Sequence, residues 1–274
     1  MITIRAAIEQ GSELLGRDGI PEPRLTAEVL LGHAIHCERT YFYAHPEQEL
    51  REVEWIHYGR YLDERLRGKP TQYITKRQEF YGREFKVSPD VLIPRPETEV
   101  LVETILKLKP APGVIVDIGT GSGIIAITLA LELARPVIAT DLSFEACEIA
   151  RCNALKLGAV VQFLQADLVK SFADGSVDIV VSNPPYVALS DRATLQREVR
   201  DWEPSLALYG GQDGTEVYAR LIPEAKRVLK PGGILALELG FGQSEVVSQL
   251  VGSCRRQLIP DLAGIPRVLI CQRP

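Results

Sequence analysis

The stretch "VDIGTGSGIIAI", residues 116–127, joins an apolar strand to an apolar helix through a loop that contains three glycines. Gly119, Gly121 and Gly123 allow the backbone to turn tightly and let a ligand approach it closely. In open α/β sheets ligands bind at the carboxyl ends of the strands, which is where this loop falls. The stretch therefore predicts a nucleotide-type pocket at one edge of a sheet.

The neighbouring segments repeat the same rhythm of strand and helix. Apolar runs at 136–141, 160–167 and 177–182 alternate with helical stretches such as "FEACEIARCNALKLG". Strands that are apolar throughout and alternate with helices indicate a parallel sheet covered on both faces. "GILALEL" is followed after one helix by "RQLIPDL" and "RVLICQR", which we interpret as an antiparallel pair at the sheet edge. The fold class is therefore α/β.

The chain before this sheet has a different character, and we divide it into three parts. Residues 1–69 predict a small helical bundle, because apolar positions recur at helical spacing. Residues 70–93 contain "TQYI" and "EFYGREFKV", whose alternation around a glycine predicts a β-hairpin connector. Residues 94–274 form the α/β domain, which begins with a helix after "IPRP".

Composition excludes several classes of protein. The chain has 274 residues, of which 46% are hydrophobic and 24% charged, and its formal net charge is -5. These values are globular, and the acidic balance does not favour nucleic acid or an anionic membrane as partner. The first residues lack the pattern of a signal peptide, and no apolar run approaches bilayer length. We therefore expect a cytoplasmic protein, and a monomer.

The cysteines predict neither disulfides nor a metal centre. There are five of them, and no two have the Cys-x-x-Cys spacing, so we interpret them as small buried apolar side chains. His33 and His36, with Cys37 beside them, could share a helix face and bind a metal, but ordinary packing is favoured. We expect no metal.

The third glycine of the loop decides which nucleotide is favoured. A dinucleotide fingerprint needs glycine at position 124, which is Ile124 here, and this disfavours a nicotinamide dehydrogenase. Asp141 ends the next strand, where an acceptor would meet ribose hydroxyls. Asp167 ends the third strand and could address an adenine amino group. Helix capping or a turn is the structural alternative for both aspartates.

This pattern resembles the S-adenosylmethionine pocket of Rossmann-like class I methyltransferases, whose seven-stranded, mostly parallel sheet also ends in an antiparallel pair. The resemblance implies S-adenosylmethionine as the methyl donor. It assigns cofactor binding to Gly119, Thr120, Gly121, Ser122, Gly123, Asp141, Asp167, Leu168 and Asn183.

"NPPY", residues 183–186, holds a polar amide at the end of an apolar strand. Pro184 forces Asn183 toward an extended conformation, and Pro185 does the same to Pro184. The Asn183 side-chain oxygen and the Pro184 carbonyl could then accept both N–H bonds of a planar amide or aromatic amine. Tyr186 would pack on the planar face of that group. The structural alternative is a loop that merely ends the strand.

NPPY is similar to the motif of amino-methyltransferases, which act on adenine N6 or glutamine N5. The wider chain resembles the release-factor glutamine methyltransferase family. The resemblance is carried by "GKPTQYI", "EFYGREFKV", "VLIPRPETEVLV", "DIGTGSGIIAITLA", "SNPPYV" and "EPSLALYGGQDG".

The family resemblance implies methyl transfer to the side-chain nitrogen of the glutamine in the Gly-Gly-Gln loop of peptide chain release factors. Asn183, Pro184, Pro185 and Tyr186 would cradle that amide, with catalytic roles for Asn183, Pro184 and Tyr186. The helical bundle would recognise the release factor, and no direct nucleic acid is required. Relatives often carry an aromatic residue where this chain has Leu168, so contact with adenine there would be aliphatic.

Three alternatives stay open at this point. An adenine-N6 methyltransferase of DNA or RNA would flip a base into the same pocket, although the acidic composition weighs against it. A ribosomal-protein glutamine methyltransferase shares NPPY and much of the fold. A non-catalytic module that binds a partner through the helical bundle would not need to keep the loop, Asp141 and NPPY together. The chain's own Gly-Gly-Gln at 210–212 is followed by Asp-Gly and is interpreted as a turn.

Overall fold

The computed structural model describes residues 2–274, which divide into two compact units. The first unit comprises the chain up to Arg77 together with residues 196–202. The second comprises residues 78–195 and 203–274. A short segment of the α/β part of the sequence thus belongs to the N-terminal unit, which the sequence did not indicate.

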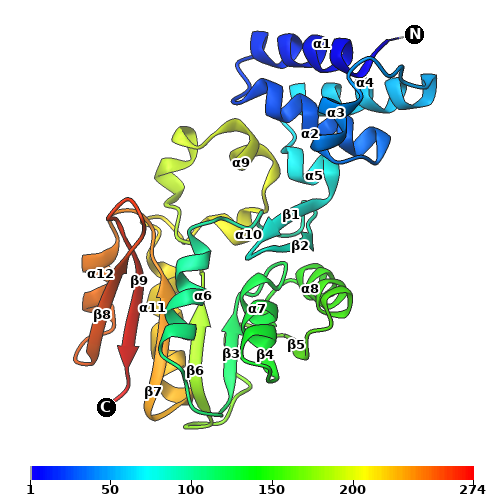
Figure 1. The fold of residues 1–274 in the computed structure, drawn as a ribbon. Helices are drawn as coiled ribbons and strands as arrows, with labels where there is room; N and C mark the ends of the chain where they lie inside the picture. Colours follow the sequence, from blue (N-terminus) through cyan, green and yellow to red (C-terminus); the bar gives the residue numbers. More distant parts are fainter. Residues whose placement is uncertain (1) are drawn as a thin grey trace. The chain divides into compact units, whose positions relative to one another are not determined.

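The first unit is helical (Figure 1). An apolar cluster forms its core, in which Tyr58 is fully buried and donates its hydroxyl to the Ala7 carbonyl at 3.3 Å. Gly11 leaves room for that hydroxyl, because a Cβ at this position would lie 2.0 Å from it. The helices are α1 (Ile4–Arg17), α2 (Pro23–Ile35), α3 (Arg39–Ala44), α4 (Glu52–Leu66), α5 (Thr71–Thr75) and α9 (Arg197–Trp202). The buried side chain of Arg65 pairs with Glu198, which joins α4 to α9.

The expected hairpin is shorter than its sequence pattern. Its strands are β1 (Arg77–Phe80) and β2 (Arg83–Lys86), whereas the preceding "TQYI" lies in the helix α5. Ile74 packs into the core of the first unit, and the Thr75 hydroxyl donates to the Thr71 carbonyl at 3.1 Å. Packing of one apolar side chain therefore outweighed the β-branched composition of this stretch.

The second unit contains the expected seven-stranded, mostly parallel sheet, so the predicted fold class is confirmed (Figure 1). Its strand order is β5-β4-β3-β6-β7-β9-β8, and the first five of these run parallel. The last two strands are antiparallel, as their sequence predicts. The strands are β3 (Ile115–Ile118), β4 (Val137–Asp141), β5 (Val161–Gln165), β6 (Val177–Ser182), β7 (Leu229–Glu238), β8 (Arg255–Pro260) and β9 (Pro266–Gln272).

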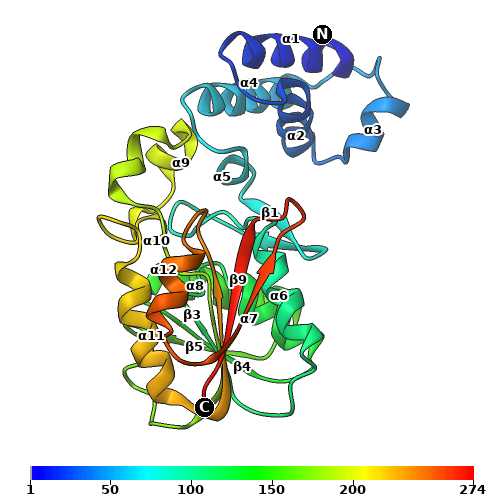
Figure 2. The same cartoon turned by 90° about the vertical axis from the view of Figure 1, so that its left-hand side faces the viewer.

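Helices cover both faces of this sheet (Figure 2). One face packs against α6 (Thr98–Lys107), α7 (Ile124–Glu132) and α8 (Phe144–Leu157), and the other against α11 (Glu216–Val228) and α12 (Ser244–Leu250). Side chains alternate between the two cores along each strand, so Ile115 belongs to one and Val116 to the other. The remaining short helices are η1 (Leu189–Thr194) and α10 (Ser205–Leu208).

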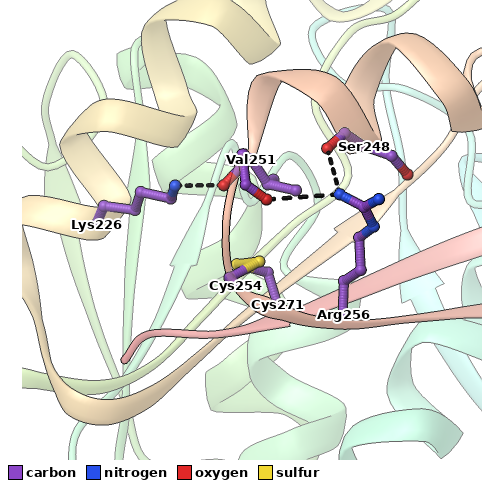
Figure 3. Close-up of a disulfide and its surroundings, with 7 residues drawn as sticks. Lys226, Ser248, Val251, Cys254, Arg256 and Cys271 are labelled. Atoms are coloured by element: carbon purple, nitrogen blue, oxygen red, sulfur yellow. Dashed lines mark hydrogen bonds between the residues drawn. A yellow bond between two sulfur atoms is a disulfide. The ribbon is translucent and has the colours of Figure 1, made fainter.

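The antiparallel edge corrects the expectation about cysteines. Cys254 and Cys271 form a disulfide with their Cα atoms 5.9 Å apart, while Cys37, Cys147 and Cys152 are free (Figure 3). Cys254 immediately precedes β8 and Cys271 lies in β9, so pairing of these strands brings the two residues together. Cysteine spacing in the sequence carries no information about such a pairing.

Residues 2–274 contain neither a helix that could span a membrane nor a cluster of metal-ligating side chains. None of their helices combines the length and apolarity that a membrane span requires. Within the same range, no three side chains of His, Cys, Asp or Glu converge where a metal ion could be held.

Candidate active site

A cavity of about 370 Å³ lies over the carboxyl ends of the parallel strands in the second unit. This volume falls in the range of pockets that bind small organic molecules. Loops that follow β3, β4, β5 and β6 supply one part of its lining. The sequence-predicted residues in that lining are Gly119, Thr120, Gly121, Ser122, Asp141, Asp167, Leu168, Asn183, Pro184 and Pro185.

The glycine loop needs its glycines. Gly121 and Gly123 have φ values of 55° and 87°, a region that side chains with a Cβ rarely adopt. A Cβ on Gly123 would also lie 2.7 Å from the Ile127 side chain, so this residue permits α7 to start close to the loop. Gly123 itself lies outside the lining of the cavity. Its role in the structure is to shape the turn.

A buried carboxyl supports this loop from beneath, and the sequence argument missed it. Asp117 lies in β3 and is completely buried. Its Oδ2 accepts hydrogen bonds from the Thr120 hydroxyl at 2.7 Å and from the Ala126 N–H at 3.2 Å. Its Oδ1 has no partner within residues 2–274, and burial raises the pKa of Asp117 to about 7. One acidic residue in an otherwise apolar strand was the available signal.

Asp141 lies at the end of β4, as expected, and contacts the glycine loop directly. Its Oδ2 accepts from the Gly121 N–H at 2.9 Å, and its Oδ1 accepts from the Ser143 N–H at 2.9 Å. Burial raises the pKa of this carboxyl. Asp141 therefore fixes the loop and also presents carboxylate lone pairs to the cavity.

Asp167 and Leu168 follow β5 and form a further part of the wall. Hydrogen bonding from Lys170 and the charge of Arg220 lower the pKa of Asp167, whose Oδ1 accepts from Arg220 at 2.7 Å. Leu168 has a φ of 57°, which is strained for a residue with a branched side chain. Strain of this kind persists where the surroundings fix the backbone, and it is frequent at binding sites.

Asn183 lies directly after the carboxyl end of β6, and the glycine loop follows the carboxyl end of the neighbouring parallel strand β3. The preceding Ser182 is buried and donates its hydroxyl to the Ile118 carbonyl at 2.7 Å, which joins the ends of β6 and β3. The Asn183 Nδ2 donates to the Thr98 hydroxyl oxygen at 3.1 Å. Asn183, Pro184 and Pro185 all line the cavity, so the two motifs singled out from the sequence meet there.

Tyr186 lies beside the cavity and is not among its lining residues. Its ring packs against the apolar core between the sheet and the helices α11 and α12, and burial raises the pKa of its hydroxyl. Its carbonyl accepts a hydrogen bond from the Gln243 side chain at 2.9 Å. The structure therefore places Tyr186 as a support behind the prolines.

Two wall segments were not assigned to the site from the sequence, although most of their residues belong to stretches that carry the family resemblance. Residues 89–95 and 204–209 contribute most of this second part of the lining. Glu203 joins them, because its buried carboxylate pairs with Arg95 and accepts from the Ile93 N–H at 3.3 Å. No pattern within either stretch alone could reveal this contact.

The chain's own Gly-Gly-Gln loop packs against the backbone of the NPPY segment. A Cβ on Gly210 would lie 2.5 Å from the Pro185 carbonyl oxygen, and a Cβ on Gly214 would lie 2.3 Å from the Tyr186 carbonyl oxygen. The Gln212 N–H donates to the Glu216 carboxylate at 2.8 Å, at the start of α11. These glycines therefore allow two backbone segments to approach each other closely.

Comparison with known families gives two matches that together span most of the chain. Residues 6–75 match the family described as PrmC N-terminal domain, and residues 96–201 match the methyltransferase small domain. A release factor glutamine methyltransferase of Koribacter versatilis is 43% identical over 278 residues, covering 100% of this chain and 99% of the relative. A protein of the same name from Moorella thermoacetica is 43% identical and covers 99% of each chain.

Solved structures show the same fold. A methyltransferase from Pyrococcus furiosus has a TM-score of 0.55 at 23% identity, over 74% of this chain and 93% of its own. The Mtq2-Trm112 complex of E. cuniculi, which is described as responsible for methylation of the termination factor eRF1, contains a chain with a TM-score of 0.51. That chain is 23% identical, with 68% of this chain and 99% of its own covered.

Proposed function

The chain belongs to the family of release factor glutamine methyltransferases, and on that premise we propose that it methylates peptide chain release factors. The acceptor is the side-chain nitrogen (N5) of the glutamine in their Gly-Gly-Gln loop, and the donor is S-adenosylmethionine. The observation that carries the proposal is that residues 119–122 of the glycine loop and Asn183, Pro184 and Pro185 of NPPY line one cavity, in a chain with full-length relatives of this name.

The residues of the cavity fit this donor. A volume of about 370 Å³ can hold much of a nucleoside with an amino-acid tail. The loop from Gly119 to Gly123, with Asp141, Asp167, Leu168 and Asn183, would hold it, and Asp141 is the acceptor for ribose hydroxyls. The unpartnered Oδ1 of Asp117 leaves a buried acceptor beneath the loop. S-adenosylmethionine supplies a methyl group on a positively charged sulfur, whose departure leaves a neutral thioether.

NPPY would position the acceptor nitrogen. An amide nitrogen is a poor nucleophile because its lone pair is delocalised, so orientation matters more than acid or base strength. The Asn183 Oδ1 and the Pro184 carbonyl accept its two N–H bonds and aim the nitrogen at the methyl carbon. The nitrogen–carbon bond forms as the carbon–sulfur bond breaks, and the nitrogen then gives one proton to water. Such orientation can contribute about 7 to 11 kcal/mol at best.

Pro185 and Tyr186 complete the cradle in this proposal. Pro185 lines the cavity, and the half-buried Tyr186 follows it with its backbone carbonyl held by Gln243. Their contribution is rigidity, because acceptors that already point at the developing positive charge need no reorganisation during the reaction. We propose that the first unit recognises the body of the release factor, and that the reaction takes place in the cytoplasm without nucleic acid.

Transfer of labelled methyl tests the proposal. The purified chain is incubated with labelled S-adenosylmethionine and a release factor, and the product is digested and analysed by mass spectrometry. We expect one methyl group on the glutamine of the Gly-Gly-Gln loop, and none on a release factor in which that glutamine is changed to alanine. DNA and a mixture of ribosomal proteins serve as competing acceptors. Labelling of either one without labelling of the release factor would contradict the proposal.

A further inference from the structure

The Asn183 amide has two ends of nearly equal shape and opposite hydrogen-bonding character. Its Oδ1 accepts, whereas its Nδ2 donates, and only the first can bind the N–H groups of an acceptor amide. A rotation of 180° would present a donor to another donor. A site built on this side chain therefore needs a neighbour that distinguishes the two orientations.

Thr98 is that neighbour in the structure. It begins α6, it is completely buried, and its Oγ1 accepts from the Asn183 Nδ2 at 3.1 Å. Both residues also line the cavity. Thr98 belongs to "IPRPETE" and Asn183 to "NPPY", so this hydrogen bond joins two motifs that lie 85 residues apart. With Nδ2 engaged in this way, Oδ1 is the end that remains for a substrate.

A hydroxyl both donates and accepts, so the direction of the Thr98 O–H also matters. Glu238 ends β7, next to β6, and only 1% of its surface is exposed. Its carboxyl oxygens have no hydrogen-bond partner within residues 2–274. Burial raises the pKa of Glu238 to about 7, and the Thr98 and Tyr186 hydroxyls lie near enough to offset part of that rise. Glu238 is thus the acceptor available to the Thr98 proton.

We propose that Thr98 is a positioning residue, which accepts from the Asn183 amide and directs its own proton toward Glu238, so that Asn183 Oδ1 faces the substrate amide. This inference rests on the proposed function and deepens it. The arrangement is directional: N–H of Asn183 to O–H of Thr98 to carboxyl of Glu238. If the Asn183 amide were rotated, Thr98 would have to donate to Asn183 Oδ1, and its proton would no longer point toward the Glu238 carboxyl.

Another threonine of the same helix shows what a purely structural hydroxyl does. The Thr104 Oγ1 donates to the Val100 carbonyl of its own helix at 2.7 Å, and Thr104 is not a lining residue of the cavity. Thr98 reaches a side chain on another element instead. Thr104→Val is therefore a matched control, since it removes a hydroxyl from α6 without touching Asn183.

The test compares Thr98→Val, Thr98→Ser and Thr104→Val in methyl transfer to a release factor, with S-adenosylmethionine affinity and thermal unfolding measured for each. We expect Thr98→Val to lower kcat about 10- to 100-fold, as misplacement of a positioned group does, with cofactor affinity within about threefold of the parent. Thr98→Ser and Thr104→Val should stay within about threefold of the parent kcat. Glu238→Met should lower kcat about 10-fold, because the Thr98 proton loses its acceptor.

An unchanged kcat in Thr98→Val or in Glu238→Met would overturn the inference. So would equal loss in Thr98→Ser and Thr98→Val, because the hydroxyl would then not be the group that matters. A parent protein that methylates no release factor would instead contradict the proposed function. The two failures are therefore distinguishable in one experiment.

Discussion

Two regions of the sheet differ in how their polar groups are hydrogen-bonded. We call the carboxyl ends of the parallel strands the rim, and the antiparallel pair β8 and β9 with the loop between them the edge. At the rim, buried oxygens of Asp117 and Glu238 have no hydrogen-bond partner among residues 2–274. At the edge, Asp261 accepts from two backbone N–H groups and pairs with Arg267, and the strands are joined by a disulfide. Unsatisfied buried groups are rare and costly, so these two carboxyls, which lie outside the cavity lining, mark the rim as the less satisfied of the two regions.

The edge is closed by further local contacts (Figure 3). The Arg256 guanidinium donates to the Ser248 carbonyl at 3.1 Å, and Lys226 donates to the Val251 carbonyl, so the last turn of α12 is capped by side chains. Such contacts satisfy carbonyls that a helix end otherwise leaves open. The comparison teaches that the edge satisfies its polar groups by local contacts, while the rim leaves buried carboxyl oxygens of Asp117 and Glu238 unsatisfied.

The largest effect should follow from a change at the rim. We expect Asn183→Ala to lower the kcat of methyl transfer by about 1,000-fold, which corresponds to about 4 kcal/mol, because the acceptor amide loses one of two oriented partners. Affinity for S-adenosylmethionine, measured by calorimetry, should change by less than about tenfold. At the edge, the Gln257 side chain is exposed on β8, so Gln257→Ala should leave kcat unchanged. Near-parental turnover of Asn183→Ala would contradict the assigned cradle.

The second-largest effect should be on the pH dependence of stability, which has opposite signs for Glu238 at the rim and Asp261 at the edge. Burial raises the pKa of Glu238 from its usual 4.5 to about 7, so the folded state binds its proton more tightly than the unfolded state. Its contribution to the free energy of unfolding is complete below about pH 4.5 and is lost as pH rises through 7. The loss approaches about 1.4 kcal/mol per pH unit, or roughly 3 kcal/mol in all.

Glu238→Gln should therefore flatten the fall in stability between pH 5 and pH 8, as measured by urea unfolding. Part of the fall in stability with pH should remain in this variant, because burial also raises the pKa of Asp117 to about 7. At the edge, backbone hydrogen bonds lower the pKa of Asp261, so its contribution is present at neutral pH and is lost as pH falls. An identical pH profile for the parent and Glu238→Gln would show that Glu238 is not protonated on folding.

The smallest effect should come from breaking the covalent link at the edge. The disulfide between Cys254 and Cys271 closes a loop with a sequence separation of 17. Loop closure of this length corresponds to about 3 kcal/mol, and measured values are often lower, so we expect Cys254→Ser to lower the free energy of unfolding by about 2 kcal/mol. Methyl transfer by this variant should equal that of the parent at 25 °C. A large loss of kcat would mean that edge and rim are coupled.

Much of the fold could be predicted because its signals are local or periodic. Apolar strands alternating with helices predicted the parallel sheet, and the final strands predicted its antiparallel end. Tertiary packing added what local patterns do not carry: Ile74 packs with the helical core while "TQYI" lies in a helix, and residues 196–202 belong to the first unit. The short helices between 189 and 208 have no strong periodicity, so their sequence gave no clear prediction.

By itself, the sequence determined the α/β fold, the glycine loop and the rigid NPPY segment. These depend on the φ freedom of glycine and the restriction by proline, which act within a few residues. Only the tertiary structure decided that Thr98 would accept from Asn183, that Glu203 would join two walls, and that Cys254 would meet Cys271. These contacts depend on strand order and on which helix lies over which strand end, and such long-range packing leaves no pattern in adjacent residues.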